Sequence, residues 1–328
     1  MLDYRALAPP RLPRKEHSLT VTPPRIAVLV PCYNEALTVA AVVSGFRAAL
    51  PDATIFVYDN NSNDGTAEVA RAAGAQVRFE AMPGKGNVVR RMFADIDADW
   101  YIMVDGDATY DATAAPRLVE TAIEGGYDMV NMARAETGQK AYRAGHRLGN
   151  RLLTGLVGAI FGARTRDMLS GYKIFSRRFA KSFPAMSSGF EIETELMVHV
   201  LELRLPVAEI SAPYGERPEG STSKLATYRD GFIILRLIGI LVQRERPLEF
   251  FTSMAGLLAL ASLILGLPVV WTFAETGLVP KLPTAVLAAS LMLASLLAIA
   301  IGLILNAITH MRREAKRLAY LAIWRSGP

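Results

Sequence analysis

Residues 26–65 read IAVLVPCYNEALTVAAVVSGFRAALPDATIFVYDNNSNDG and contain two short apolar runs, each followed at once by polar residues. The runs at 26–30 and 54–58 predict strands, and the residues 36–50 between them predict a helix. A strand, a helix and a second strand in this order are typical of two parallel strands joined by a crossover.

The same alternation continues along the chain beyond this first unit. Further strands are predicted at 76–79, 100–104 and 128–132, and further helices at 66–73, 86–96 and 114–124. The pattern therefore predicts an α/β domain whose mainly parallel sheet carries helices on its faces. Ligands of such sheets bind just beyond the carboxyl ends of the strands, so the residues that follow each strand are the candidates for a site.

Those residues are polar after the first, second and fourth predicted strands, in the segments 31–35, 59–66 and 105–111. We expect Asp59, Asp105 and Asp107 to crowd one edge of the sheet. Clustered carboxylates repel each other, so this arrangement needs a compensating ligand. A divalent cation or the hydroxyl groups of a bound molecule would supply it.

Asp105 and Asp107 form an Asp-x-Asp pair directly after an apolar strand. In an extended segment, residues i and i+2 point to the same face, so both carboxylates can face one cation. Mg²⁺ and Mn²⁺ take oxygen ligands and are often held by one or two carboxylates together with substrate phosphates. The pair therefore predicts a Mg²⁺ or Mn²⁺ site at Asp105 and Asp107 that also holds a diphosphate.

Two long runs near the C-terminal end, 250–273 and 284–309, contain no charged residue. Each is about 24–26 residues long, roughly 36–39 Å as a helix, which is enough to cross a hydrocarbon core of about 30 Å. The segment 274–283 between them predicts a tight turn, so 249–310 is expected to be a transmembrane hairpin. Two buried helices of a soluble protein are the alternative.

Basic residues near the two runs indicate the orientation of the hairpin. They flank its open end as Arg244, Arg246, Arg312, Arg313, Lys316 and Arg317, whereas the turn holds only Lys281. The positive-inside rule then places the N-terminal domain and the basic tail, 311–328, in the cytoplasm, with the hairpin in the inner (plasma) membrane. The segment 227–248 predicts an amphipathic helix in the membrane interface, or a packed core helix. Residues 1–24 predict a flexible arm.

The composition excludes several classes of protein. The chain has 328 residues, a net charge of +5 and a single cysteine, so it has no intrachain disulfide. Many of its cations flank the apolar runs, which argues against a nucleic-acid partner. The four histidines form no zinc-ligand pattern, and neither a P-loop nor a dinucleotide-binding glycine motif is present.

In order and spacing, the motifs PCYNEA, DNNSNDGT, PGKGNVVR and VDGDATYD resemble the GT-A domain of family 2 glycosyltransferases. LSGYKIFSRRF, GFEIETEL and ERPEGSTSKL, with the hairpin, resemble the polyprenyl-phosphate glycosyltransferases of that family. The resemblance covers about residues 25–310. It implies a GT-A domain at 25–226, a nucleotide-sugar donor, a polyprenyl-phosphate acceptor and the same divalent metal.

The resemblance also implies roles for individual residues. The donor would be held by Pro31, Tyr33, Asn34, Glu35, Asp59 and Lys85, and its diphosphate and metal by Asp105 and Asp107. Arg217, Ser223 and Lys224 would contact phosphate groups of donor and acceptor, and Arg134 and Arg147 the acceptor phosphate. Asp167 lies near the reaction centre, where it either acts as a base or orients another group.

Two departures from the family pattern concern the donor. Thr109 stands where relatives commonly have glutamine in Asp-Ala-Asp-x-Gln, and the tract 60–63 replaces a more acidic one. The resemblance nevertheless favours UDP over GDP, with inversion at the anomeric carbon, and is compatible with a homo-oligomer. A processive polysaccharide synthase and a non-catalytic membrane scaffold or flippase partner are the alternatives. Glu191, Glu193 and Glu195 either favour a helix N-terminus or lie near the site.

Overall fold

The computed structural model describes residues 23–136, 154–155, 157–158, 167–189, 191–215, 239–240 and 242–323. The chain divides into two compact units, one of residues 1–226 with 316–328 and one of residues 227–315. Nearly all of the predicted arm and most of the predicted interfacial helix lie outside the described residues.

The first unit contains the sheet and its helices. In chain order the elements are β1 (Ile26–Cys32), α1 (Val39–Ala49), β2 (Thr54–Asp59), α2 (Thr66–Ala72), β3 (Gln76–Phe79), α3 (Lys85–Asp95), β4 (Trp100–Met103), the 3-10 turn η1 (Ala112–Ala114), α4 (Ala115–Glu124), β5 (Met129–Glu136), β6 (Lys173–Ser176), α6 (Arg177–Ser182), α7 (Ile192–Glu202) and β7 (Val207–Tyr214).

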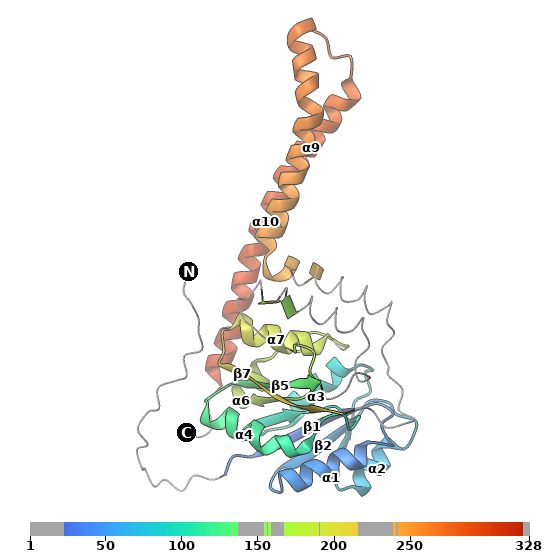
Figure 1. Ribbon diagram of the computed structural model, residues 1–328. Coiled ribbons are helices and arrows are strands. Elements are labelled where there is room, and N and C mark those ends of the chain that lie inside the picture. The colour runs from blue at the N-terminus through green and yellow to red at the C-terminus, as the bar shows by residue number, and fades with distance from the viewer. Residues whose placement is uncertain are drawn as a thin grey trace, which may run out of the picture. The chain divides into compact units, whose positions relative to one another are not determined.

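The seven strands form one mixed sheet in the order β3-β2-β1-β4-β6-β5-β7 (Figure 1). The first four are parallel to one another, β6 runs antiparallel to both of its neighbours, and β5 and β7 are parallel. The predicted mainly parallel sheet is therefore confirmed. Cys32 is in register with Asp59, and Leu29 with Met103, so the carboxyl ends of β2, β1 and β4 meet at one edge.

Side chains alternate between the two faces of the sheet, as the period of two requires. Ile102 and Ile174 belong to the apolar core that also contains residues of α1 and α4. Tyr101 and Phe175, one residue along each strand, each contact Phe93 of α3 in edge-to-face geometry. Helices therefore cover both faces, with α1 and α4 on one and α3 on the other (Figure 1).

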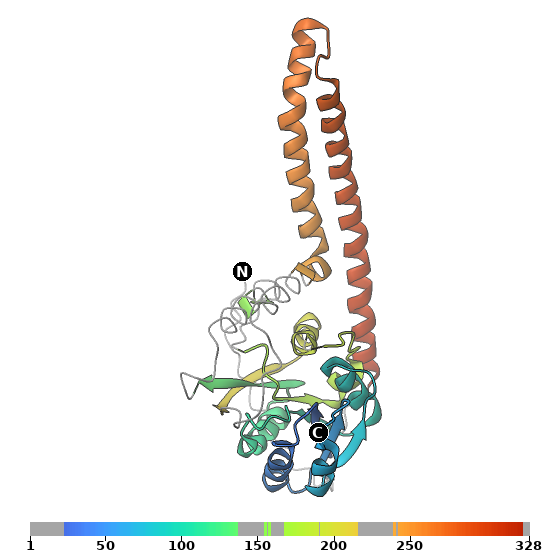
Figure 2. The same cartoon turned by 90° about the vertical axis from the view of Figure 1, so that its right-hand side faces the viewer.

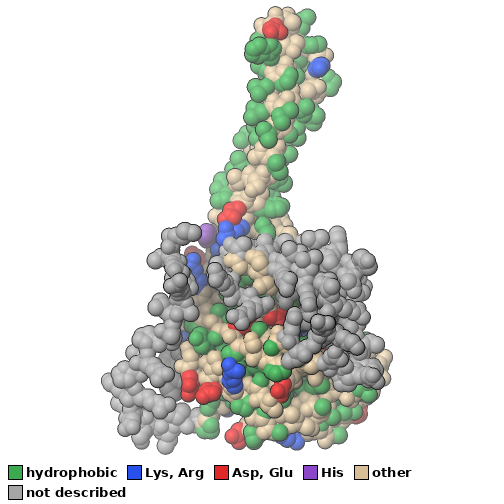
Figure 3. Space-filling model, in the orientation of Figure 1, with side chains coloured by type: hydrophobic (Ala, Val, Ile, Leu, Met, Phe, Trp, Pro, Cys, Tyr) green, Lys and Arg blue, Asp and Glu red, His purple; other side chains and the backbone are tan. Residues whose placement is uncertain are grey.

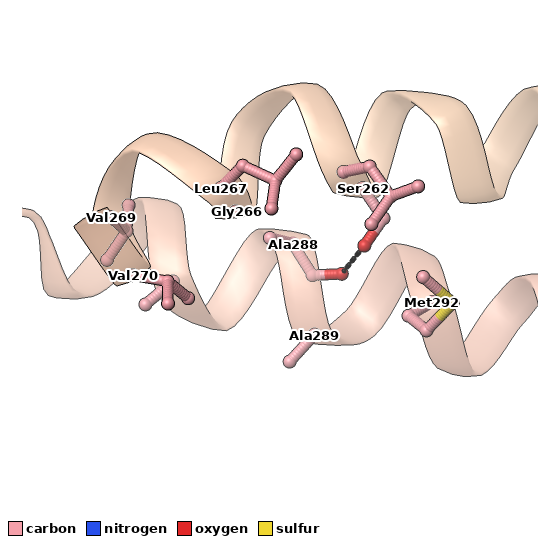
Figure 4. A pocket seen from close by; sticks show the side chains of 10 residues that line it. Ser262, Gly266, Leu267, Val269, Val270, Ala288, Ala289 and Met292 are labelled. Carbon is pink, nitrogen blue, oxygen red and sulfur yellow. Dashed lines mark hydrogen bonds between the residues drawn. The ribbon is translucent and has the colours of Figure 1, made fainter. Parts of the chain in front are cut away.

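The second unit is dominated by two long helices, α9 (Pro247–Thr276) and α10 (Leu282–Ala322), which lie side by side (Figure 2). Small residues line their contact: the Ser262 hydroxyl donates to the Ala288 carbonyl at 2.7 Å, around a small apolar pocket (Figure 4). The Ser295 hydroxyl donates to the Ala255 carbonyl at 2.8 Å. Small residues and interhelical hydroxyl bonds are typical of helices that pack in a membrane.

Both helices are long and apolar enough to cross a membrane. Hydrophobic side chains recur along their whole visible surface, and the charged side chains lie toward the two ends (Figure 3). An exposed apolar surface of this extent in water is unfavourable, so the pair indicates membrane association.

Helix α10 continues through the charged segment that the sequence predicts to be a basic tail, and ends at Ala322. From Lys316 onward it belongs to the first unit. Lys316 Nζ lies 2.6 Å from Glu202 at the end of α7, and the Tyr320 hydroxyl donates to Asp128 at 2.8 Å. From Lys316 to Ala322 the tail is therefore a helix of the first unit, and its polar side chains find partners within that unit.

Candidate active site

The loops that follow β1 and β2 are tied together by hydrogen bonds. The backbone N–H of Asn34 donates to Ser62 Oγ at 2.9 Å, and the N–H of Asn63 donates back to Asn34 Oδ1 at 2.9 Å. The N–H of Glu35 donates to Thr66 Oγ1 at 2.8 Å. These bonds fix the predicted donor-binding residues 31–35 beside the end of β2, while the Tyr33 ring stays 47% exposed.

Asp59, at the end of β2, is 7% exposed, and its Oδ1 has no hydrogen-bond partner among the described residues. A buried carboxylate oxygen without a donor is costly, so this atom is suited to accept from a ligand. The next residue, Asn60, donates to the carbonyls of Glu80 and Met82 and accepts from the N–H of Gly84. The first asparagine of the tract is therefore used to hold the loop that leads into α3.

Gly84, Lys85 and Gly86 form a tight turn at the start of α3. The N–H of Gly86 donates to the Ser188 carbonyl at 3.0 Å. A Cβ at Gly84 or Gly86 would collide with the backbone carbonyls of Ser188 and Ser187, respectively, so only glycine fits at both positions. The close approach directs the Lys85 side chain inward, where it is 8% exposed.

The Lys85 ammonium lies between two carboxylates, with Nζ 2.5 Å from Asp105 Oδ1 and 2.5 Å from Glu193 Oε1. Glu193 is in the first turn of α7 and is buried. Burial opposes the charge on Lys85, but Asp105 and Glu193 together raise its pKa above the ordinary value. Burial raises the pKa of Glu193, which Lys85 partly offsets. The lysine therefore stays protonated between these two acids.

Gly171, just before β6, lies against the Asp105 carboxylate, and a Cβ there would collide with it. The backbone N–H of Gly171 donates to the Tyr110 hydroxyl at 2.7 Å. Burial raises the pKa of Tyr110 well above its usual value, so its hydroxyl stays protonated. The SGYK segment, residues 170–173, therefore packs against Asp105, the first aspartate of the Asp-x-Asp pair, and helps to position it.

Asp107 is buried at 3% exposure, and Thr109 contacts its Oδ1 twice. The Thr109 hydroxyl donates at 2.6 Å and the Thr109 N–H at 3.2 Å. The residue that departs from the family pattern therefore orients the second aspartate of the pair.

Asp105 and Asp107 carry carboxylate oxygens of the kind that Mg²⁺ or Mn²⁺ would take as ligands. Within the described part of the chain, no group of three or more acidic, histidine or cysteine side chains could hold a metal by itself. Two carboxylates suit a cation that takes its remaining oxygen ligands from a diphosphate and water.

Arg134 and Asp167 form a buried two-point ion pair. Arg134 Nε donates to Oδ2 of Asp167 at 2.6 Å and Nη2 donates to Oδ1 at 2.8 Å. Burial would raise the pKa of Asp167, but the hydrogen bonds and charge of Arg134, with the charge of Lys173, lower it below the ordinary value. The Arg134 guanidinium also lies over the Tyr214 ring. Asp167 is therefore suited to orient Arg134 and poorly suited to take up a proton.

A buried polar network supports this pair from behind. Asn131 Nδ2 donates to the Asp167 carbonyl at 2.7 Å and to Glu209 at 3.0 Å, and Lys173 Nζ donates to Asn131 Oδ1 at 2.6 Å. Lys173 is fully buried, and burial lowers its pKa to about 8. These residues were not among the predicted site residues, although a lysine at the start of an apolar strand indicates a buried charge that needs partners.

The structure brings the predicted residues together in two clusters, Lys85 with Asp105 and Arg134 with Asp167. Glu193 joins the first cluster and also lies in the first turn of α7, so it combines the two alternatives considered for it. Four predicted residues, Arg147, Arg217, Ser223 and Lys224, lie outside the described residues.

Several known proteins are similar to this chain in sequence or in fold. Residues 27–183 match the family described as Glycosyl transferase family 2. Glycosyltransferase AglJ of Haloferax volcanii is 36% identical over 233 residues, which cover 71% of this chain and 77% of that protein. The dolichyl-phosphate hexose transferase of the same organism is 25% identical over 221 residues, covering 67% of this chain and 95% of its own.

One solved structure is the glucosyl-3-phosphoglycerate synthase of Mycobacterium tuberculosis, in complex with Mn²⁺, UDP-glucose and glycerol 3-phosphate. It aligns with a TM-score of 0.56 at 23% identity, over 68% of this chain and 80% of the other. This likeness shows the fold, and the predicted GT-A architecture is confirmed.

Proposed function

The chain belongs to glycosyl transferase family 2 and is a glycosyltransferase, and from this premise we propose that it moves one sugar from a nucleotide sugar onto a polyprenyl phosphate. The transfer would invert the anomeric carbon. An oxygen of the lipid phosphate forms a new bond to the anomeric carbon, while the bond between that carbon and the nucleoside diphosphate breaks.

The donor would lie along the edge where β2, β1 and β4 end. The unsatisfied Oδ1 of Asp59 is suited to accept from an N–H of the base, and the loops at 31–35 and 60–66 are already fixed around it. UDP is favoured over GDP by the family resemblance, and the solved relative noted above was crystallised with a UDP-sugar.

The diphosphate would reach Asp105, Asp107 and Lys85 at the end of β4. Mg²⁺ or Mn²⁺ held by the two aspartates would neutralise the charge of the leaving diphosphate. Lys85 adds a second positive charge next to it, already protonated and buried. The Thr109 hydroxyl holds the Asp107 carboxylate in place for this role.

The acceptor phosphate is anionic at neutral pH, so its oxygen needs no base to become a nucleophile. It does need a cation, because it must approach a second anion. The ion pair with Asp167 fixes the guanidinium plane of Arg134, and the low pKa of Asp167 fits an orienting role. We assign Arg147, Arg217, Ser223 and Lys224 to the same phosphates from the family resemblance.

A lipid acceptor agrees with the apolar helices α9 and α10, and one relative is named for transfer of a hexose to dolichyl phosphate. The basic residues around the open end of the hairpin favour the cytoplasmic face of the inner membrane for the catalytic unit and both termini.

The observation that carries the proposal is the buried Lys85 ammonium held by Asp105 at the sheet edge where β2, β1 and β4 end, the edge that also carries the buried Asp59 with its unsatisfied Oδ1. To test it, purified full-length protein in detergent is incubated with Mn²⁺, polyprenyl phosphate and a panel of UDP- and GDP-sugars. The lipid product is read by mass spectrometry. We expect one nucleotide sugar to give a lipid that carries one sugar.

Asp107→Ala should lower this transfer by about 10³-fold, since it removes a metal and diphosphate ligand. Asp111→Ala is the matched control, because Asp111 lies in the same loop but caps η1 through the N–H of Thr113. Full transfer by Asp107→Ala would refute the proposal. A lipid with several added sugars would favour the processive synthase instead.

A further inference from the structure

One acidic residue at the site, Glu193, has no role in the transfer described above. It lies 108 residues from Lys85 in sequence and meets it in space, with Oε1 of the carboxylate 2.5 Å from the ammonium. Its side chain is 10% exposed and Lys85 is 8% exposed, so water screens neither group well.

The Lys85–Asp105 contact competes with the role proposed for Asp105. Asp105, the carboxylate that receives the lysine, is also the one proposed to hold a divalent cation with its diphosphate. If Asp105 were the only counter-ion of Lys85, a cation at Asp105 would leave a buried ammonium unpaired, which is strongly unfavourable. The second carboxylate removes this difficulty, because Glu193 remains paired with the lysine.

The helix dipoles of α7 and α3 act on the charges of Glu193 and Lys85. Glu193 lies in the first turn of α7, where the helix dipole favours a negative charge. Lys85 is the first residue of α3, where the dipole disfavours a positive charge and increases its need for carboxylates. Glu193 is therefore a stable anchor, and Asp105 is the partner that the lysine can release.

We propose that Glu193 is a positioning residue that retains Lys85 in the site while Asp105 changes partner from the lysine to a metal-bound diphosphate. This inference rests on the proposed function for the identity of the donor. It predicts that loss of the Glu193 charge ties Lys85 to Asp105 and weakens metal binding.

The test compares two buried glutamates of the same helix. Glu202, at the far end of α7, also pairs with a lysine, with 2.6 Å to Lys316, and its side chain is 1% exposed. Glu193→Gln and Glu202→Gln therefore remove equivalent charges, and only the first is at the site. Binding of Mn²⁺ in the presence of UDP is measured by electron paramagnetic resonance on the full-length protein, with no sugar transfer involved.

We expect Glu193→Gln to raise the Mn²⁺ dissociation constant about tenfold, and Glu202→Gln to leave it within about twofold. In a Lys85→Gln background, Glu193→Gln should have no further effect, because it acts through the lysine. Unchanged Mn²⁺ binding in Glu193→Gln, or equal weakening in both glutamate variants, would overturn the inference.

If Glu193→Gln does not give folded protein, Glu193→Asp takes its place in the Mn²⁺-binding measurement. It keeps the charge but shortens the side chain, so an intermediate weakening is expected, and wild-type binding would count against the inference. If the wild-type protein binds Mn²⁺ and UDP but transfers no sugar to polyprenyl phosphate, the proposed acceptor fails and the Glu193 result still stands.

Discussion

The two buried cations of the site are held in different ways. Lys85 has two carboxylates around one ammonium, each reached through a single contact. Arg134 engages a single carboxylate among the contacts of the described residues, Asp167, through two hydrogen bonds from its side chain and a third from its backbone. The first cluster has an excess of acid and can accept another cation. In the second, the closed cluster, three hydrogen bonds hold Arg134 against Asp167 in one geometry.

This difference indicates which of the two clusters is expected to exchange partners during the reaction. A lysine ammonium is a compact charge on a flexible stem and can exchange partners, whereas an arginine fork is rigid and directional. The Lys85 cluster is suited to receive a metal and a diphosphate. The Arg134 cluster is suited to hold an acceptor phosphate in a fixed position.

Among the tests of this comparison, the largest expected effect comes from breaking the closed cluster. Asp167→Asn leaves Arg134 without its buried counter-ion, and we expect a loss of about 10²-fold in kcat/KM for the lipid acceptor. The pH–rate profile should keep its shape, because the low pKa keeps Asp167 ionised throughout. Initial rates across pH check both points.

Asp97→Asn is a suitable control for this variant. Asp97 also pairs with an arginine, at 2.9 Å from Arg177, but its side chain is 52% exposed, so little change is expected. If Asp167→Asn instead removes the acidic limb of the profile, Asp167 acts as a base and the comparison of the two clusters is wrong.

A smaller effect tests the acid-rich cluster. Thr109→Val keeps the shape of the side chain and removes the hydroxyl that donates to Asp107. We expect the Mn²⁺ concentration for half-maximal transfer to rise about tenfold, while Thr109→Ser, which retains the hydroxyl, stays close to wild type. A titration of the transfer rate with Mn²⁺ measures this. Equal behaviour of the valine and serine variants would show that the hydroxyl is not needed.

The smallest expected effect is on the stability of the fold. It comes from Lys173, in the polar network that supports Arg134 and Asp167. The pKa of Lys173 falls from an ordinary 10.5 to about 8 in the fold, because burial disfavours its charge more than Glu193 and Asp167 favour it. Below pH 8 the lysine is charged in both the folded and the unfolded state, so its contribution does not change. Between pH 8 and 10.5 only the unfolded state still holds the proton, so raising the pH stabilises the fold.

Lys173→Met lacks this titration. The melting temperature of the wild type relative to Lys173→Met should therefore rise by a few degrees between about pH 7.5 and pH 9.5. Thermal melts in detergent at the two pH values test this difference. A difference that stays constant, or falls, would mean that Lys173 is not neutralised in the fold.

Much of the sheet edge is predictable from the sequence. Each strand and the polar residues that follow it form a local pattern, and parallel strands bring their carboxyl ends to the same edge. This pattern placed Asp59, Asp105 and Asp107 after β2 and β4, and the register of the strands agrees. The strands β6 and β7 lay beyond the alternation that the sequence argument followed. The antiparallel insertion of β6 between β4 and β5 depends on tertiary pairing that no local pattern contains.

The pairing within the site is likewise a tertiary property. Glu193 and Lys85 meet only because the N-termini of α3 and α7 converge on the same point, so helical spacing alone could not decide between a capping and a site role for Glu193. The same holds for Arg134 and Asp167, which come from β5 and a segment before β6. The family resemblance identified three of these four residues, and the structure supplies their partners.

The most direct test of the central claim compares two lipid acceptors that differ by one phosphate. Full-length protein with its nucleotide sugar and Mn²⁺ is offered polyprenyl phosphate or the corresponding polyprenol, and the rate of sugar incorporation into lipid is measured. Because a phosphate oxygen is already anionic, and because Arg134 lowers the pKa of Asp167 and so makes it a weak base for an alcohol, we predict transfer to the phosphate and none to the alcohol. Transfer to the polyprenol at a comparable rate would contradict the account.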